Sequence, residues 1–77
     1  MRIEILGSGC PKCRATERIV REQLQTLGLT ADVVHVTDPQ EMRKYQVVFT
    51  PAVVVDGRVV SSGHVPTGEE VSHFLGA

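Results

Sequence analysis

The pattern of apolar and polar positions divides the chain into seven segments, each of which predicts a strand or a helix. Short runs of branched apolar residues predict strands at 2–6, 31–36, 52–55 and 58–62. Apolar residues at helical spacing, or sequences that begin helices, predict helices from 11 to about 27, from 39 to about 45 and from 68 to 75. The expected order is therefore β-α-β-α-β-β-α, which is typical of an α/β domain.

The first helix is expected to be amphipathic and to end at a glycine. Its apolar face consists of Ile19, Val20, Leu24 and Leu27. Gly28 suits the position after the last helical residue, and Leu29 could fold back onto the last turn. This face predicts how the helix packs on the sheet.

The two later helices begin with recognisable capping sequences. Asp38 can cap the second helix, Pro39 fits its first position, and Glu41 completes a capping box. Thr67 and Glu70 form a second capping box at the start of the last helix.

The turn and crossover signals predict a mixed four-stranded sheet. Asp56-Gly57 is a two-residue hairpin signal, so the fourth strand should run antiparallel to the third. Helical connections allow the first three strands to be neighbours. We expect a single domain over residues 1–77, with the sheet flanked by three helices.

Composition and charge exclude several classes of function. The formal net charge of −1 favours neither nucleic acid nor a membrane surface as a partner. Only Tyr45, Phe49 and Phe74 are aromatic, which argues against a platform for stacked bases. No apolar run approaches the ~18 residues of a membrane span, and no secretory signal is evident. We expect a cytoplasmic monomer.

The only two cysteines form a close pair between the first strand and the first helix. The segment Cys10-Pro11-Lys12-Cys13 follows the flexible Gly7-Ser8-Gly9. One pair is too few for a disulfide framework and suits redox chemistry or a soft metal ion better. With Cys10 as the N-cap, Pro11 takes the first helical position, where its missing N–H has no consequence.

This position predicts different roles for the two thiols. The helix N-terminus and the cation of Lys12 favour a thiolate at Cys10 and should lower its pKa, so Cys10 is the expected exposed nucleophile. Cys13 lies one turn further in and is suited to attack a mixed disulfide and release the product. The alternative is a pair of inert, buried cysteines.

The chain resembles the thioredoxin fold, and most of all the small thioredoxin-like proteins of archaea and bacteria called redox-active disulfide protein 2. The resemblance covers essentially the whole chain. It rests on Gly9-Cys10-Pro11-Lys12-Cys13, Thr50-Pro51-Ala52, Asp56-Gly57 and the Ser62-Gly63 segment.

This resemblance implies a substrate-binding edge beside the cysteine pair. Pro51 would form a cis peptide bond facing the pair, and the backbone of Thr50 would pair with an extended substrate segment. Gly9, Pro11 and Gly63 would complete the substrate contacts. The alternative for Pro51 is an ordinary trans proline that begins an edge strand.

The resemblance also implies a role for Glu4, which lies six positions before the first cysteine. A buried acid there would take a proton from Cys13 as that thiol attacks. The alternative is a glutamate that reaches solvent from a sheet face. We expect Tyr45 to close the core rather than to line the site. The three histidines show no ligand spacing and are expected at the surface or a sheet edge: His35, His64 and His73.

Departures from better-known relatives leave the reductant and the substrate open. Gly9 stands where ordinary thioredoxins have Trp, and Pro11-Lys12 replaces Gly-Pro between the cysteines. A proline after the first cysteine is more like glutaredoxins. However, residues 62–66 lack the Gly-Gly-x-x-Asp sequence of the glutaredoxin glutathione site.

The expected function is a thiol–disulfide oxidoreductase that reduces disulfide-containing proteins and is reduced again by an unidentified upstream reductase. Its redox group would be the Cys10–Cys13 disulfide, with no other cofactor and no metal. The alternative is a soft-metal carrier of Cu(I) or Zn that uses both thiols. Such carriers have Met where this chain has Ser8, and their order is β-α-β-β-α-β. An adaptor without turnover is a third possibility.

Overall fold

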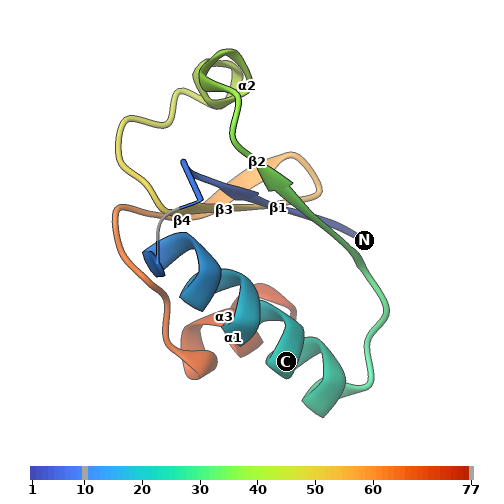
Figure 1. Cartoon of the computed structure of the whole chain (residues 1–77). Helices are drawn as coiled ribbons and strands as arrows, with labels where there is room; N and C mark the ends of the chain where they lie inside the picture. Colours follow the sequence, from blue (N-terminus) through green and yellow to red (C-terminus); the bar gives the residue numbers. More distant parts are fainter. Residues whose placement is uncertain (10, 77) are drawn as a thin grey trace.

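A computed structural model of the chain describes residues 1–9 and 11–76 and has the predicted element order (Figure 1). The strands and helices are β1 Arg2–Leu6, α1 Pro11–Leu27, β2 Asp32–Val36, α2 Pro39–Lys44, β3 Ala52–Val55, β4 Arg58–Ser62 and α3 Gly68–Phe74. The expected α/β class is confirmed, and the predicted bounds differ by one residue at β2, α2 and α3.

The four strands form one mixed sheet in the order β2-β1-β3-β4. The central strand β1 is parallel to β2 and antiparallel to β3, and β4 runs back along β3 as the hairpin signal predicted. Asp56 and Gly57, both with positive φ, form the turn. Figure 1 shows α1 and α3 on one side of the sheet and α2 on the other.

The larger core lies between the sheet and the pair α1 and α3. It consists of Ile3, Ile5, Val20, Leu24, Val53, Val71 and Leu75. The buried stripe of α1 continues through Thr16 to Cys13, whereas Ile19 and Leu27 are only partly buried. The predicted apolar face is therefore correct at Val20 and Leu24. The other two buried residues of α1 are Thr16 and the second cysteine, Cys13.

A smaller core covers the face of the sheet that is turned toward α2. Leu6, Ala52 and Val54 are buried there, and Val36, Met42, Tyr45 and Val47 pack against them. The prediction that Tyr45 belongs to the core is confirmed. No residue of α2 is itself fully buried, so a few half-buried side chains attach this helix to the sheet.

The ends of α1 and α3 follow the predicted capping chemistry. Gly28 has a φ of +67°, and the Leu29 amide donates to the Leu24 carbonyl at 2.9 Å. Thr67 Oγ1 accepts from the Glu70 amide, and Glu70 Oε1 accepts from the Thr67 amide, each at 3.1 Å. This is a complete capping box.

The predicted capping box of α2 forms only in part. Asp38 Oδ1 accepts from the Gln40 amide at 2.9 Å and caps the helix. The carboxylate of Glu41 instead accepts from Lys44 Nζ at 2.9 Å, because one turn of helix brings this cation within reach. The prediction that Glu41 completes the box was therefore wrong.

None of the helices in the described part of the chain is long and apolar enough to cross a membrane.

Candidate active site

Three connections meet at one end of the sheet and bring most of the predicted site residues together. They are the turn from β1 into α1, the segment from α2 to β3, and the loop from β4 to α3, all on the left of Figure 1. Helix α1 begins at Pro11, as predicted. Cys10 lies outside the described residues, so its expected roles as N-cap and exposed nucleophile stay predictions.

Cys13 is fully buried in the first turn of α1, where its sulfur lies against Gly7. A Cβ atom added to Gly7 would overlap Cys13 Sγ, and it would lie 3.8 Å from Thr50 Cβ. The glycine therefore makes room for the sulfur at the point where Thr50 also approaches. Sequence reasoning treated Gly7 only as flexible and missed this role.

The Thr50–Pro51 peptide bond is cis, as the resemblance implied, so the trans alternative was wrong. Pro51 is buried, whereas Thr50 is exposed and leads into β3. The Gly63 amide donates to the Pro51 carbonyl at 3.0 Å. The structure therefore brings Cys13, Thr50, Pro51 and Gly63 into one neighbourhood.

Gly63 also contacts an exposed aromatic residue. Its φ is +84°, and a Cβ atom added there would lie 3.3 Å from Phe49 Cβ. Phe49 is 70% exposed and Val48 is 82% exposed. These two side chains form an apolar surface beside Thr50 that sequence reasoning missed, because apolar residues before a strand pattern are usually assigned to the core.

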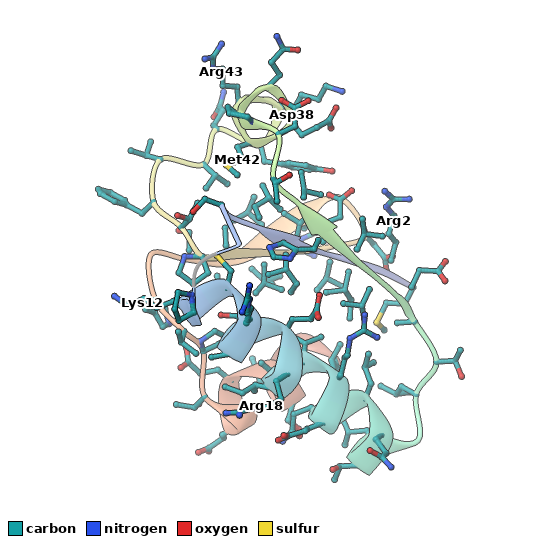
Figure 2. The ribbon with its side chains drawn as sticks, in the orientation of Figure 1. Arg2, Lys12, Arg18, Asp38, Met42 and Arg43 are labelled. Carbon is teal, nitrogen blue, oxygen red and sulfur yellow. The ribbon has the colours of Figure 1, made fainter. Side chains whose placement is uncertain are left out.

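The other predicted residues of the cysteine segment lie at the start of α1. Gly9 has a φ of +82°, and Pro11 and Lys12 are exposed. Figure 2 shows Lys12 on the same side of the molecule as the three connections. The Lys12 carbonyl accepts from Thr16 Oγ1 at 2.8 Å, which satisfies this buried hydroxyl within the helix.

Glu4 is buried, with 9% of its surface exposed, so the solvent-facing alternative was wrong. It lies opposite Val54 in the β1–β3 register and therefore faces α2, whereas Ile3 and Ile5 face α1. Helix α1, which carries Cys13, packs on the other side of the sheet. The role of Glu4 as proton acceptor for Cys13 stays a prediction.

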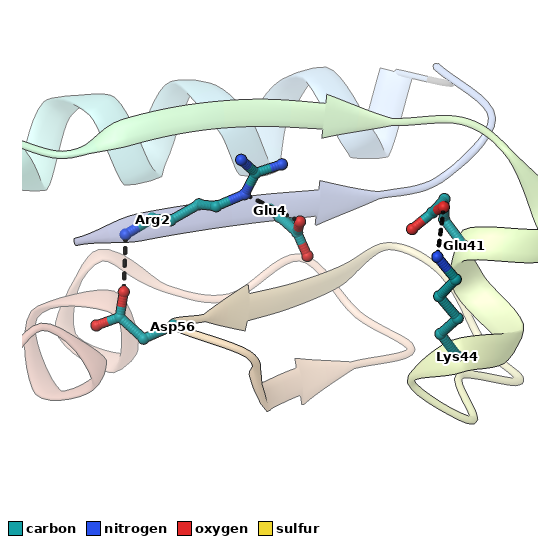
Figure 3. Close-up of polar contacts among 5 residues, drawn as sticks. All are labelled: Arg2, Glu4, Glu41, Lys44 and Asp56. Carbon is teal, nitrogen blue, oxygen red and sulfur yellow. Dashed lines mark hydrogen bonds and ion pairs between the residues drawn. The ribbon is translucent and has the colours of Figure 1, made fainter.

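The carboxylate of Glu4 has two neighbours on its own side of the sheet. Its Oε1 accepts from Arg2 Nε at 3.1 Å (Figure 3). Hydrogen bonding to Glu4 is the main cause that raises the pKa of Tyr45, followed by burial and by the negative charge of Glu4. Oε2 of Glu4 is buried and has no partner of standard hydrogen-bond geometry among the described residues, Tyr45 included.

A polar contact in the β4–α3 connection holds the loop that carries Gly63. His64 Nδ1 lies 3.3 Å from the Ser62 carbonyl, and His64 Nε2 lies 3.3 Å from Glu70 Oε2. Hydrogen bonds from the Thr67 amide and from His64 lower the pKa of Glu70. His64 and His73 are exposed and His35 lies in the edge strand β2, as predicted for all three.

The order of the elements does not match the one expected for the metal-carrier alternative. Helix α2 lies between β2 and β3 in sequence, which differs from the order expected for such carriers.

Comparison with known proteins identifies close relatives over nearly the whole chain. A family model described as a thioredoxin domain matches residues 1–76. The chain is 40% identical over 73 residues to a thioredoxin of Methanocaldococcus jannaschii, and this match covers 95% of this chain and 84% of that protein. It is 29% identical over 75 residues to a thioredoxin of Methanothermobacter thermautotrophicus, and this match covers 97% of each protein.

Proposed function

The chain belongs to the thioredoxin family and is a thiol–disulfide oxidoreductase that acts on disulfide-containing proteins, and from this we propose that Cys10 and Cys13 are its redox pair. Cys10 is the nucleophile and Cys13 the resolving thiol. The observation that best supports this division is the burial of Cys13 against Gly7, beside Thr50. A sulfur so placed is shielded from external reagents, and in the sequence it follows position 10 by three residues.

The proposed reaction moves two electrons in two exchange steps. The Cys10 thiolate attacks one sulfur of the target disulfide, forms a mixed disulfide and releases the other target sulfur as a thiolate. The Cys13 thiolate then attacks the Cys10 sulfur, which forms the Cys10–Cys13 disulfide and releases the second target thiolate. The target is reduced, and an upstream dithiol reductase must return two electrons to the pair.

We infer that the substrate binds as an extended segment along Thr50. Pro51 has no N–H, so it offers no donor that would hold the attacking thiolate. Thr50 is exposed, so its backbone is available for strand addition. Gly63 flanks this edge, since its amide donates to the Pro51 carbonyl, and we assign Gly9 and Pro11 at the start of α1 to the substrate contacts as well. Val48 and Phe49 add apolar surface, which favours substrates with an apolar residue near the disulfide.

We assign this reaction to the cytoplasm, where cellular reductants keep thiols reduced and a reductant is the expected direction of the exchange. We also propose that the protein acts as a monomer. It needs no resident cofactor or metal in this reaction, because the two sulfurs hold both electrons themselves.

Turnover of a disulfide-bonded test protein in the presence of dithiothreitol tests this function. The unmodified chain should accelerate reduction, and Cys10→Ser and Cys13→Ser should each abolish turnover. Chelator treatment should leave the rate unchanged. A chain that gives no acceleration but binds one Cu(I) tightly would be a metal carrier, and one that binds the test protein without turnover would be an adaptor.

A further inference from the structure

Glu4 is a buried carboxylate on the face of the sheet that is opposite to α1. It is the only acidic side chain that is buried among the described residues. Burying a carboxylate is unfavourable unless donors compensate it, so its neighbours indicate what holds it there.

Only one oxygen of this carboxylate has a hydrogen-bond partner among the described residues. Oε1 accepts from Arg2 Nε at 3.1 Å, and Arg2 is itself held at the end of β1 by its amide, which donates to Asp56 Oδ1 at 2.8 Å (Figure 3). Oε2 is buried without a standard hydrogen bond in the described part of the chain. Because a buried acceptor without a partner is unfavourable, a donor on the same face would stabilise this oxygen.

Tyr45 lies on that face and carries a neutral donor, its hydroxyl. It packs against Leu6, Ala52 and Val54, and Val54 is the partner of Glu4 across β1 and β3. Tyr45 is also the C-cap of α2, and its amide donates to the Met42 carbonyl at 3.2 Å. Its side chain therefore connects the end of α2 to the centre of the sheet.

The segment that follows Tyr45 leads directly to the substrate edge. Residues 46–50 contain no regular element and end at the cis bond between Thr50 and Pro51. Because α2 has no fully buried residue, the half-buried side chains around Tyr45 carry the attachment of this part of the chain. A change at Tyr45 should therefore be felt at Thr50.

We propose that Glu4 is a positioning residue whose carboxylate holds the hydroxyl of Tyr45 and thereby fixes where segment 46–50 presents Thr50 to a protein substrate. The effect on catalysis rests on the proposed function, in which Thr50 pairs with the substrate. The Glu4–Tyr45 contact itself does not depend on that function. This role differs from proton transfer with Cys13, because it acts through Tyr45 on the opposite face of the sheet.

The ionisation of Tyr45 agrees with this contact. Glu4 raises the pKa of Tyr45 by hydrogen bonding and by its charge, and burial and the charge of Glu41 act in the same direction. The cation of Arg2 opposes them. The net direction means that Tyr45 keeps its proton as a donor to Glu4 to a higher pH than an ordinary tyrosine does.

Titration of the phenol tests the contact directly. The chain has one tyrosine and no tryptophan, so ultraviolet absorbance near 295 nm reports Tyr45 alone. The unmodified protein should ionise above the ordinary tyrosine range, and Glu4→Gln should lower the midpoint. Glu69→Gln, at an exposed position of α3, is the matched control and should not move it. Equal midpoints in the unmodified protein and Glu4→Gln would overturn the proposal.

Exchange with two kinds of disulfide tests the positioning role. Glu4→Gln and Tyr45→Phe should each slow reaction with a disulfide-bonded protein about three- to tenfold, the effect of losing one hydrogen bond. Tyr45→Phe should leave reaction with a small-molecule disulfide unchanged, since a small reagent does not need the Thr50 edge. The double variant should be no slower than either single variant. Tyr45→Phe keeps the ring in the core, so it reports the hydroxyl even if Glu4→Gln folds poorly.

Two outcomes would overturn the positioning role. A loss with both disulfides in Glu4→Gln, with none in Tyr45→Phe, would mean that Glu4 acts on Cys13 as a proton acceptor. Unchanged rates with both disulfides in both variants would mean that the contact has no effect on the substrate edge. If the unmodified protein reacted with no disulfide, the proposed function would fail, and the phenol titration would still decide the Glu4–Tyr45 contact.

Discussion

At the scale of single residues, the site depends on a glycine that contacts a sulfur. Cys13 Sγ occupies the space that a side chain at Gly7 would need, and Thr50 approaches the same point. Neither the spacing of the cysteines nor the resemblance to thioredoxins indicates this contact, because it depends on how the end of β1 meets the first turn of α1. The cis bond at Pro51, in contrast, was predictable from the resemblance of Thr50-Pro51 to the thioredoxin fold.

Gly7→Ala should destabilise the protein by about 1–3 kcal/mol, because the added methyl group overlaps a buried sulfur in a packed region. Urea unfolding measures this loss. Ser8→Ala is the control, since Ser8 is exposed and its truncation should change stability by less than about 0.5 kcal/mol. Adding Cys13→Ala should restore part of the stability in Gly7→Ala, and a double variant that recovers nothing would contradict the contact.

Lys12→Glu should raise the pKa of Cys10, because it replaces a cation near the helix N-terminus by an anion. The rate of alkylation against pH, measured in a Cys13→Ser background, reports Cys10 alone. Arg43→Glu makes the same change of charge at an exposed position of α2 and should leave the profile in place. Superimposable profiles for Lys12→Glu and its parent would refute the expected role of the lysine.

At the scale of elements, capping sequences and the hairpin signal were the most dependable features of the sequence. Thr67 and Glu70 form the predicted box, and Asp56-Gly57 forms the predicted turn. The box expected at Glu41 failed because Lys44 competes for the same carboxylate one turn away. Local sequence specifies which groups can pair, but it does not decide between two partners at similar distance.

The cap of α3 should make stability depend on acid pH. Hydrogen bonds from Thr67 and His64 hold the pKa of Glu70 below its ordinary value, so their contribution is fully present above that value and is lost as pH falls through the lowered one. The difference in unfolding free energy between the unmodified protein and Glu70→Gln should therefore shrink on acidification. A constant difference for Glu70→Gln would contradict the assignment.

At the scale of the whole molecule, the sequence predicts the order of elements and the site at one end of the sheet, but not which helix covers which face. Alternation along β1 indicates that Glu4 points away from Ile3 and Ile5. Only the packing of α1 and α2 on opposite faces decides that Glu4 lies on the same face of the sheet as Tyr45. The exposure of Val48 and Phe49 likewise depends on tertiary structure, because the sequence alone does not show whether these two apolar side chains are buried.

The central claim is that Cys10 attacks and Cys13 resolves. The most direct test mixes reduced, metal-free Cys13→Ser protein with a disulfide-bonded test protein at neutral pH and follows covalent adducts by mass. A mixed disulfide on Cys10 should accumulate, because no second thiol can release it, and Cys10→Ser should form none. A stable adduct on Cys13 in the Cys10→Ser protein, with none in Cys13→Ser, would contradict the account.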